Sequence, residues 1–436
     1  MTRRLDAANS IVLRTGIPRG WIEYGTDEMV DIVGGGTPDR NETAYWRNAD
    51  IPWVTPTDLT ANSSRYISGG AENISQAGLS NSNTTLVQVG SVVFSTRGTV
   101  GKMALAATPL ACNQSCEVLV PKPAKIDGEF LYYLLHFGLS AFLRLSCGTT
   151  FNAITRRDIS RVRFAMPADL EEQKAIARIL DAVDTAIERT RDAIERAEIL
   201  SRSLLLSLLE NGIDKNGKVR QREGNHDSYV EAEIGLIPNS WTVERLGDVA
   251  EVGRGRFSPR PRNDPRFYDG KYPFVQTGIV AKAKGRLIYD YEQTLNDQGK
   301  AVSREFAPGT ILVTIAANIG ETAILGIPMC VPDSIVGVCV RKPNVPRFVE
   351  LCLRRLQPRL LAIAPRSAQH NINLSTLKPL RIPVPPPDEQ QRIADVYDAS
   401  LAYEDALLGK AEALRILKNS VMHDLLNGKV RVPVLS

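Results

Sequence analysis

The sequence predicts an α+β fold in which two long antiparallel coiled-coil helices separate two strand-rich α/β domains, with a pseudo-twofold internal repeat. Three observations predict it: a series of motifs occurs twice, runs rich in Val, Ile and Phe are broken by Gly, Pro and Asn, and each copy ends in an apolar seam with helical spacing. We expect strand-rich domains at 1–168 and 236–386, helices at 169–212 and 387–436, and a linker at 213–235.

The repeat consists of five blocks that keep one order. The first begins with Ile-Pro-x-x-Trp at Ile17 and again at Ile237, and a Gly-led apolar run follows at Gly90 and Gly309. The other blocks are Pro-Trp-Val with Pro-Phe-Val, Asn-Ala-Ile-Thr with Asn-Ile-Asn-Leu, and two helix openings that both contain Glu-Gln. The offset between the copies drifts only from 220 to 217 residues, which indicates a duplicated unit.

Each copy ends in an unusually long helical pattern. Charged residues occupy the face opposite the apolar seam, which is typical of a coiled coil. Both patterns stop at Asn-Gly, where glycine suits a left-handed C-cap. The seam residues are Ile176, Leu180, Val183, Ile187, Ile194 and Leu204 in the first helix, and Ile393, Val396, Tyr403, Leu407, Leu414 and Leu417 in the second.

A helix of about 38 residues would be roughly 57 Å long, which is too long for one domain to bury. We therefore expect the two seams to pair antiparallel and to act as a spacer, with the strand-rich domains at opposite ends. The alternative is that each helix packs on its own domain.

Composition is that of an ordinary globular protein, with 43% hydrophobic and 23% charged residues. The net charge of +4 permits an anionic partner without requiring one. Six cysteines give no disulfide framework, and Cys112 with Cys116 lacks the second pair that a zinc site needs, so we expect no metal. We expect no signal peptide and no membrane span, because the apolar stretch 309–340 is interrupted by polar residues and proline. The expected compartment is the cytoplasm.

No motif for catalysis emerges. The chain lacks a phosphate-binding loop, a G-x-G-x-x-G after a strand, and the Asn/Asp-Pro-Pro-aromatic motif of adenine methyltransferases. The four histidines have no catalytic spacing, and the nuclease-like stretch 332–342 lacks the second acid. We expect the chain to bind without reacting and to hold no cofactor of its own.

Charge is concentrated in the second copy, where residues 250–290 contain nine bases and four acids. The stretch 253–267 interleaves Arg with Gly, Pro and Phe, and such a loop can follow a phosphate backbone and direct a guanidinium to a guanine edge. The alternative is a solvated surface loop. The candidate DNA-binding residues of this copy are Arg254, Arg256, Arg260, Arg262, Gln276, Thr277, Lys282, Lys284 and Asn318.

The first copy is less basic in the corresponding region, 34–59. Its aromatics Tyr45, Trp46 and Trp53 fit a core better than a base-stacking surface. The loops differ between the copies although the framework is shared, as expected if each copy reads a different short sequence. The candidate DNA-binding residues are Arg40, Arg47, Thr55, Thr57, Asp58, Arg97 and Lys102.

Together these residues resemble the specificity subunit of type I restriction-modification enzymes over roughly 16–431. The resemblance rests on both Ile-Pro-x-x-Trp motifs, the Pro-Trp-Val and Pro-Phe-Val runs, "NAITRRDISRVRF", "NINLSTLKPLRIPVPPPDEQQRIA" and the closing "LLNGKVRVP". It implies two target recognition domains, each reading one half of a bipartite site in double-stranded DNA. The first copy departs slightly, with a longer polar linker at 211–227.

The resemblance also implies partners. The helices would set the gap between half-sites and dock two methyltransferase subunits, which bring S-adenosylmethionine, while restriction subunits supply ATP- and Mg-dependent translocation and cleavage. Two rival interpretations are an enzyme that acts alone, a methyltransferase or nuclease with unfamiliar motifs, and a duplicated scaffold that binds only protein.

Overall fold

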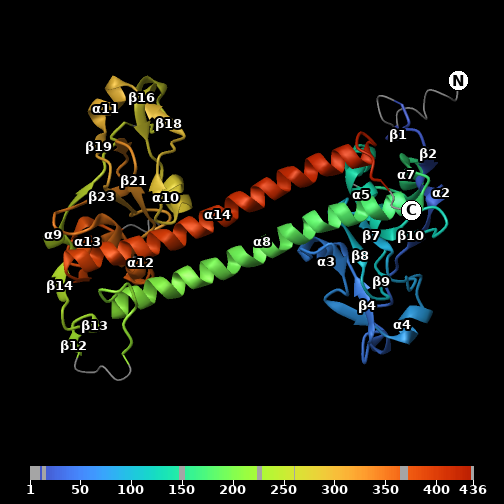
Figure 1. Cartoon of the computed structure of the whole chain (residues 1–436), viewed down its shortest axis with the longest axis horizontal. Helices are drawn as coiled ribbons and strands as arrows, with labels where there is room; N and C mark the ends of the chain where they lie inside the picture. Colours follow the sequence, from blue (N-terminus) through green and yellow to red (C-terminus); the bar gives the residue numbers. More distant parts are fainter. Residues whose placement is uncertain are drawn as a thin grey trace. The chain divides into compact units, whose positions relative to one another are not determined.

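The computed structural model describes residues 10–11, 16–146, 153–222, 228–259, 261–363 and 372–433 (Figure 1). The chain divides into two compact units, one formed by Met1–Asp192 with Gly409–Ser436 and the other by Ala193–Leu408. Each unit contains one strand-rich domain and one part of each long helix, α8 (Leu170–Asn211) and α14 (Pro387–Leu426). Among the helices described, none has the length and apolar character needed to cross a membrane.

The first strand-rich domain contains a five-stranded sheet, a smaller three-stranded sheet, and a third sheet formed by its ends. The five-stranded sheet has the order β3 (Val30–Gly34), β10 (Cys116–Pro121), β7 (Val92–Ser95), β8 (Met103–Ala106), β5 (Tyr66–Ile67). The smaller sheet is β6 (Glu72–Ile74), β4 (Ile51–Val54), β9 (Ala111–Cys112), and the third is β1 (Ser10–Ile11), β11 (Arg163–Pro167), β2 (Trp21–Gly25). The helices are α2 (Thr26–Met29), η1 (Thr43–Tyr45), α3 (Pro56–Ala61), α4 (Gln76–Ser80), α5 (Gly128–Phe137), α6 (Leu139–Ser146) and α7 (Arg156–Arg161).

The second strand-rich domain repeats this plan. Its five-stranded sheet has the order β15 (Ala250–Arg254), β23 (Ile335–Val340), β20 (Ile311–Thr314), β21 (Thr322–Leu325), β17 (Leu287–Ile288). Beside it are β18 (Gln293–Leu295), β16 (Tyr268–Phe274), β22 (Met329–Val331), β19 (Arg304–Phe306), the pair β14 (Thr242–Arg245) with β24 (Arg381–Val384), and the hairpin β12 (Tyr229–Ala232), β13 (Gly235–Pro238). The helices are α9 (Leu246–Val249), η3 (Pro265–Phe267), α10 (Thr277–Ala283), α11 (Asp297–Val302), α12 (Pro346–Ile363) and α13 (Leu374–Leu377).

The two domains therefore share one strand order, and the duplication predicted from the sequence is confirmed. In both five-stranded sheets the central strand, β7 or β20, has every residue buried, as expected for a short continuous apolar run. In both, only the outermost strand pairs parallel with its neighbour. The α+β class with two strand-rich domains and two long helices is confirmed as well.

The two long helices pair antiparallel within each unit. In the first unit Lys418 of α14 contacts Asp184 of α8, with 2.6 Å between Nζ and Oδ1. In the second unit the hydroxyls of Ser201 and Ser400 lie 2.7 Å apart. Each helix also packs on the domain of the other copy, since Leu208 of α8 lies in the core of the second domain and Leu425 of α14 in that of the first. The alternative in which each helix packs only on its own domain is wrong.

The same kind of ion pair, which we call a clasp, occurs once in each unit. It joins a glutamate at the start of one long helix to an arginine in the segment that follows the end of the other long helix. The buried carboxylate of Glu172 accepts two hydrogen bonds from Arg431, at 2.6 and 2.7 Å. The buried carboxylate of Glu389 accepts from both Nη atoms of Arg220 and from the backbone N–H of Ile213. The glutamates of the repeated Glu-Gln pairs are thus the acceptors of two equivalent clasps.

The glutamines of the same pairs hold the loop that precedes α5 or α12. Gln173 accepts from the backbone N–H of Asp127, and Gln390 from that of Val345, both at 2.9 Å. The Gln173 amide also donates to the carbonyl oxygen of Pro167, the last residue of β11. The Gln390 amide donates to that of Pro385, the residue directly after β24. At the other ends of the helices, Gly212 and Gly428 have φ of +68° and +64°, so the predicted left-handed glycines are confirmed.

The seam residues differ in burial. Tyr403 and Leu417 are exposed, at 57% and 47%, so their prediction as seam residues is wrong. The reason is that α14 turns Tyr397, Leu401 and Glu404 toward the second domain, which places Tyr403 on another face. Of the remaining seam residues, those that are fully buried are Ile176, Leu180 and Ile393, and those that are half-buried are Val183, Ile187, Ile194, Leu204, Val396, Leu407 and Leu414.

Candidate nucleic-acid interface

The basic loop after β15 is held in place by its own arginines. The Arg262 guanidinium contacts the Asp333 carboxylate at 2.7 Å, and Arg254 donates to the Asp333 carbonyl oxygen. Arg256 donates to the carbonyl oxygen of Ser303 at 3.0 Å. Arg262 is still half exposed, so it retains surface for an anion. The candidate Arg260 lies outside the described residues.

Helix α10 begins with two candidate residues. Gln276 is its N-cap, and its Nε2 donates to Oε1 of Gln293 at 2.9 Å, while Thr277 is the first helical residue. An amide has further donor and acceptor capacity, and a donor beside an acceptor is the pattern that an adenine edge requires. The start of α10 can therefore present a base-reading pair.

Two lysines lie at the other end of α10. Lys282 is 3.7 Å from the carboxylate of Glu292 and is strongly exposed. Lys284 adopts the left-handed conformation at the C-cap and lies 3.4 Å from Glu198. Pairs this exposed contribute little to stability, so both ammonium groups can exchange their carboxylate for a phosphate.

The turns between the two central strands are equivalent in the two domains but differ in chemistry. In the second domain Asn318 is exposed at the turn between β20 and β21, and its carbonyl oxygen accepts from the Thr314 hydroxyl. In the first domain the turn between β7 and β8 is fastened by the Ser95 hydroxyl to the carbonyl of Lys102 at 3.2 Å. Arg97 and Lys102 are exposed on that turn. One turn thus presents an amide and the other two cations.

Arg40 is fixed more firmly than its exposure suggests. Its guanidinium makes two hydrogen bonds to Glu72, at 2.8 and 2.9 Å, and lies 3.8 Å from the ring centre of Trp46. The hydrogen bond to Glu72 raises the pKa of Arg40, which keeps it charged. Trp53 is buried beside Trp46, so this aromatic is part of the core. Arg47, two residues after η1, is exposed.

Thr55 and Asp58 have a structural role. Thr55 is the N-cap of α3 and exchanges hydrogen bonds with Asp58 in a capping box. The second oxygen of Asp58 accepts from the backbone N–H of Ala71 at 2.9 Å. Thr57 is exposed on the first turn of α3. Of these three candidates, Thr57 is therefore the one with its side chain directed to solvent.

Sequence reasoning missed an exposed apolar strip in the second domain. Leu287, Tyr289 and Tyr291 are 48%, 55% and 47% exposed, at alternating positions through β17 and the following connection. The first domain has Ser68 and Gly70 at the positions of Tyr289 and Tyr291. The sequence signal was two aromatic residues at loop positions where the other copy has small residues, and exposed apolar side chains grouped in this way mark a contact surface.

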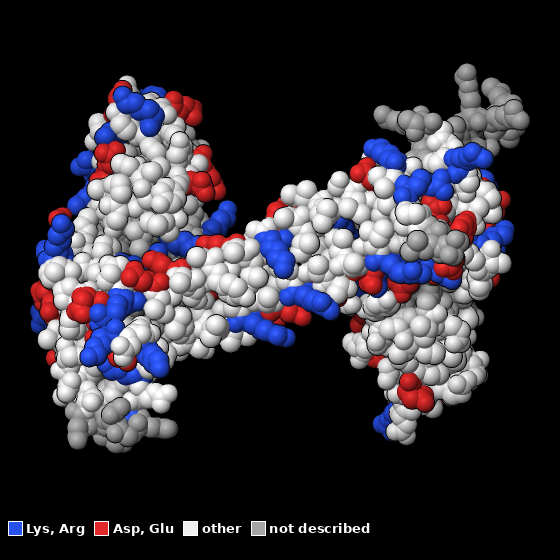
Figure 2. Space-filling view, in the orientation of Figure 1, with Lys and Arg blue, Asp and Glu red and all other residues white. Residues whose placement is uncertain are grey.

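Charge on these surfaces is mixed. Figure 2 shows Lys and Arg interspersed with Asp and Glu on the face in view of either unit. Specific contacts from separate loops fit this pattern better than a continuous basic face does.

An arginine before the parallel edge strand ties each domain to a long helix. In the first unit Arg65, before β5, contacts Asp181 of α8 and donates to the hydroxyl of Tyr133 at 2.7 Å. In the second unit Arg286, before β17, contacts Glu404 and Asp405 of α14, both at 2.8 Å. Equivalent contacts thus hold the candidate surface of each domain against a helix.

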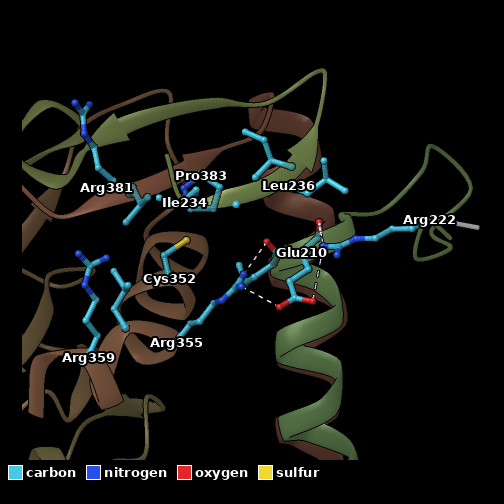
Figure 3. A pocket seen from close by; sticks show the side chains of 14 residues that line it. Glu210, Arg222, Ile234, Leu236, Cys352, Arg355, Arg359, Arg381 and Pro383 are labelled. Carbon is cyan, nitrogen blue, oxygen red and sulfur yellow. Dashed lines mark hydrogen bonds and ion pairs between the residues drawn. The ribbon is translucent and has the colours of Figure 1, made fainter. Parts of the chain in front are cut away.

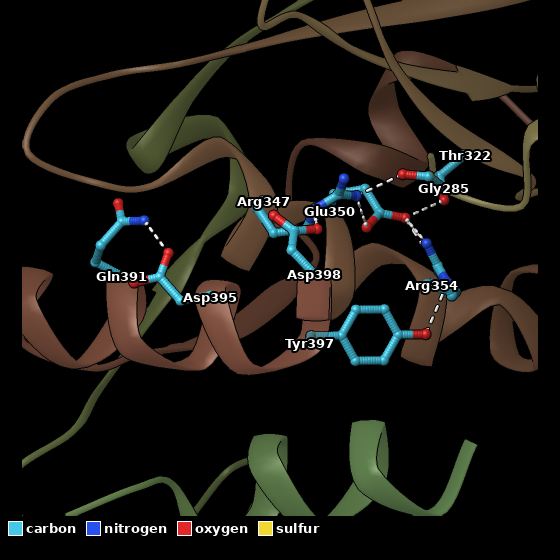
Figure 4. A network of polar contacts seen from close by, with 9 residues as sticks. All are labelled: Gly285, Thr322, Arg347, Glu350, Arg354, Gln391, Asp395, Tyr397 and Asp398. Carbon is cyan, nitrogen blue, oxygen red and sulfur yellow. Dashed lines mark hydrogen bonds and ion pairs between the residues drawn. The ribbon is translucent and has the colours of Figure 1, made fainter. Parts of the chain in front are cut away.

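A buried network around Glu350 of α12 strengthens the second attachment (Figure 4). The fully buried carboxylate accepts from the Thr322 hydroxyl at 2.6 Å, from Arg354 at 2.8 and 3.1 Å, and from Arg347 at 3.1 Å. Arg354 also donates to the hydroxyl of Tyr397 on α14. Because Thr322 belongs to β21, one carboxylate joins the central sheet, α12 and α14.

The described residues contain no group of three or more His, Cys, Asp or Glu placed to hold a metal ion. Cys112 and Cys116 are free and buried, and their contact raises the pKa of Cys116 far above its usual range. Burial and the nearby Lys418 lower the pKa of His136, so it is neutral at pH 7. His226 and His370 lie outside the described residues.

Comparison with known proteins gives a consistent result. The model of the family described as type I restriction modification DNA specificity domain matches residues 18–196 and 238–410. The type I restriction enzyme MjaIX specificity subunit of Methanocaldococcus jannaschii is 31% identical over 61% of this chain and 59% of its own length. The putative MjaX specificity subunit of the same organism is 26% identical over 95% of both chains.

Solved structures agree on the fold. The type I restriction-modification S subunit from M. genitalium matches with a TM-score of 0.58 and 16% identity over 98% of this chain and 99% of its own. A chain from a study of complex assembly and conformational transition of the type I R-M system matches with a TM-score of 0.59 and 19% identity, over 95% and 99%.

Proposed function

Because this chain belongs to the type I restriction modification DNA specificity domain family, we propose that it reads a bipartite site in double-stranded DNA, one half with each strand-rich domain. It supplies sequence specificity and no catalytic step of its own. S-adenosylmethionine, ATP and Mg would then act on partner subunits, in the cytoplasm.

The observation that carries this proposal is one framework with two sets of loops. The strand order of the five-stranded sheet is the same in both domains, yet the turn between its central strands holds Arg97 and Lys102 in one and Asn318 in the other. Cations contact phosphates and guanine edges, whereas an amide suits adenine. Two domains that differ in this way would read two different half-sites.

The candidate residues divide by role. Lys282, Lys284 and Lys102 are exposed cations whose contacts with phosphate would position each domain without selecting sequence. Gln276 presents an amide at the start of α10 and Asn318 presents one on the turn between β20 and β21, and both would read base edges. Arg40 is held by Glu72 and Trp46, so its reach is restricted and it would serve only a nearby backbone contact.

The long helices would dock two methyltransferase subunits and set the gap between half-sites. Support comes from large apolar side chains that the helices leave exposed: Ile199 and Leu200 on α8, and Tyr403, Leu408 and Ile416 on α14. An interface with partner subunits would bury these groups. Restriction subunits would join the assembled methyltransferase.

A methyl-transfer assay with labelled S-adenosylmethionine and duplex DNA tests the proposal. We expect no methyl transfer by the purified chain alone and transfer to adenine once its methyltransferase subunit is added. Transfer by the chain alone would favour an independent enzyme. A chain that shows no salt-dependent DNA binding, alone or with the methyltransferase, would favour a protein scaffold.

A further inference from the structure

The second unit contains a cavity of about 410 Å³ that the DNA-reading role does not use (Figure 3). It lies between the last turn of α8, the hairpin β12–β13, helix α12 and strand β24. The hairpin covers one side, with β12 in the predicted linker and β13 at the start of the second domain. In the described part of the first unit, β11, the counterpart of β24, pairs with β2 on one side and with the short strand β1 on the other, whereas β24 pairs with β14 alone and has the cavity beside it.

The cavity wall is strongly cationic. Four arginines line it, Arg222, Arg355, Arg359 and Arg381, against the single carboxylate of Glu210. Arg355 contacts that carboxylate at 2.9 Å, and Arg222 at 3.8 Å. Two arginines therefore share one acid, and the lining carries a formal charge of +3.

The other two arginines face the opposite part of the cavity. In Figure 3, Arg359 of α12 and Arg381 of β24 lie on the side away from Glu210. Arg381 has an acid at 3.0 Å, Glu233 of the hairpin, which is 65% exposed. An exposed partner of this kind is readily replaced by the acidic group of a ligand.

The floor between the arginines is apolar. Cys352 and Ile382 are buried beneath the cavity, and Leu236 and Leu356 border it. Apolar walls with a few convergent charged groups are the usual composition of a small-molecule site, and the volume is within the usual range. Inorganic phosphate would leave the apolar floor exposed to water. A purely apolar molecule would cover the floor but give the arginines no anionic partner.

We propose that this cavity binds an organic anion with one carboxylate or phosphate group on an apolar body. The acidic group lies between Arg359 and Arg381, and the apolar body covers Cys352 and Leu236. Bound there, the ligand connects the hairpin β12–β13 to α12 and β24 and so stabilises the second unit. A free fatty acid and an acidic residue beside leucines in a peptide share this chemistry.

Calorimetric titration of the full chain with octanoate, octylammonium and inorganic phosphate tests the proposal. We expect one octanoate per chain, and binding of octylammonium and phosphate at least ten-fold weaker. Arg359→Glu, at an exposed position, should weaken octanoate at least ten-fold. The matched control Arg415→Glu, on the exposed face of α14 in the other unit, should leave it unchanged. Thermal unfolding of each variant verifies folding.

Equal binding of octanoate and octylammonium, or unchanged octanoate binding by Arg359→Glu, would overturn the proposal in favour of adsorption to apolar surface. Phosphate binding as tight as octanoate would overturn it in favour of a further contact for the DNA backbone. A parallel titration with an acetylated Leu-Leu-Asp amide distinguishes the two sources. Tighter binding of the peptide than of octanoate identifies a peptide ligand, and tighter binding of octanoate identifies a free acid.

Discussion

Glu350 offers the sharpest test of how the second domain is fixed to helix α14. The substitution Glu350→Gln keeps the shape of the side chain but removes the charge that faces Arg347 and Arg354, whose side chains are only 10% and 18% exposed. Removing one partner of a buried ion pair costs about 3–5 kcal/mol. Arg347 keeps Asp398 at 2.7 Å, which favours the lower end, about 3 kcal/mol.

Urea unfolding followed by circular dichroism measures this cost. For a slope of about 3 kcal/mol per molar urea, the midpoint of the transition that reports the second unit should fall by about 1 M. Because a chain with two units can unfold in two steps, each transition is fitted by itself. The control Glu251→Gln removes an exposed acid that faces Arg304 at 3.3 Å, and it should shift the midpoint by less than about 0.3 M. Equal shifts for both variants would refute the reasoning.

Three further predictions concern the helices, the first unit and the DNA contacts. Inserting about four residues near Arg196 adds ~6 Å to α8 and should lengthen the gap in the methylated motif by about two base pairs; an unchanged gap would contradict the spacer role. Burial and the nearby Lys418 lower the pKa of His136, so the unfolded state binds more protons than the folded state just below about pH 6.5. The free energy of unfolding of the first unit should therefore fall as the pH drops from 7 to 5. His136→Phe should flatten that slope, and an identical slope would show that another group titrates. Lys102→Ala and Lys282→Ala should each weaken DNA binding and reduce the slope of log affinity against log salt by about 1, measured by fluorescence anisotropy, whereas Lys215→Ala in the linker should change neither.

The architecture was predictable because it depends on local sequence patterns, each of which occurs twice. The Ile-Pro-x-x-Trp motifs, the apolar runs that became β7 and β20, and the Asn-Gly stops each depend on neighbouring residues. The repeated Glu-Gln pairs showed that the two helix starts are equivalent, but not which residues these side chains contact. Arg431 meets Glu172 across 259 residues, and no periodicity in the sequence encodes such a partner.

The candidate site was less predictable for the same reason. Arg40 and Arg47 looked alike in the sequence and both are exposed, yet the guanidinium of Arg40 is held by Glu72 and Trp46. Thr55 and Asp58 resemble base-reading groups, but they cap α3. The seam failed at Tyr403 because α14 packs on a strand-rich domain as well as on α8, and a heptad pattern considers only the second of these contacts.

The most direct test of the central claim is a genome-wide map of N6-methyladenine in a host that carries this chain and its methyltransferase partner, with and without the chain. The account predicts that one bipartite motif loses methylation when the chain is deleted. It also predicts that exchanging residues 236–386 for the matching domain of a relative changes only one half of the motif. A methylation map that does not depend on the chain, or a single undivided motif, would contradict it.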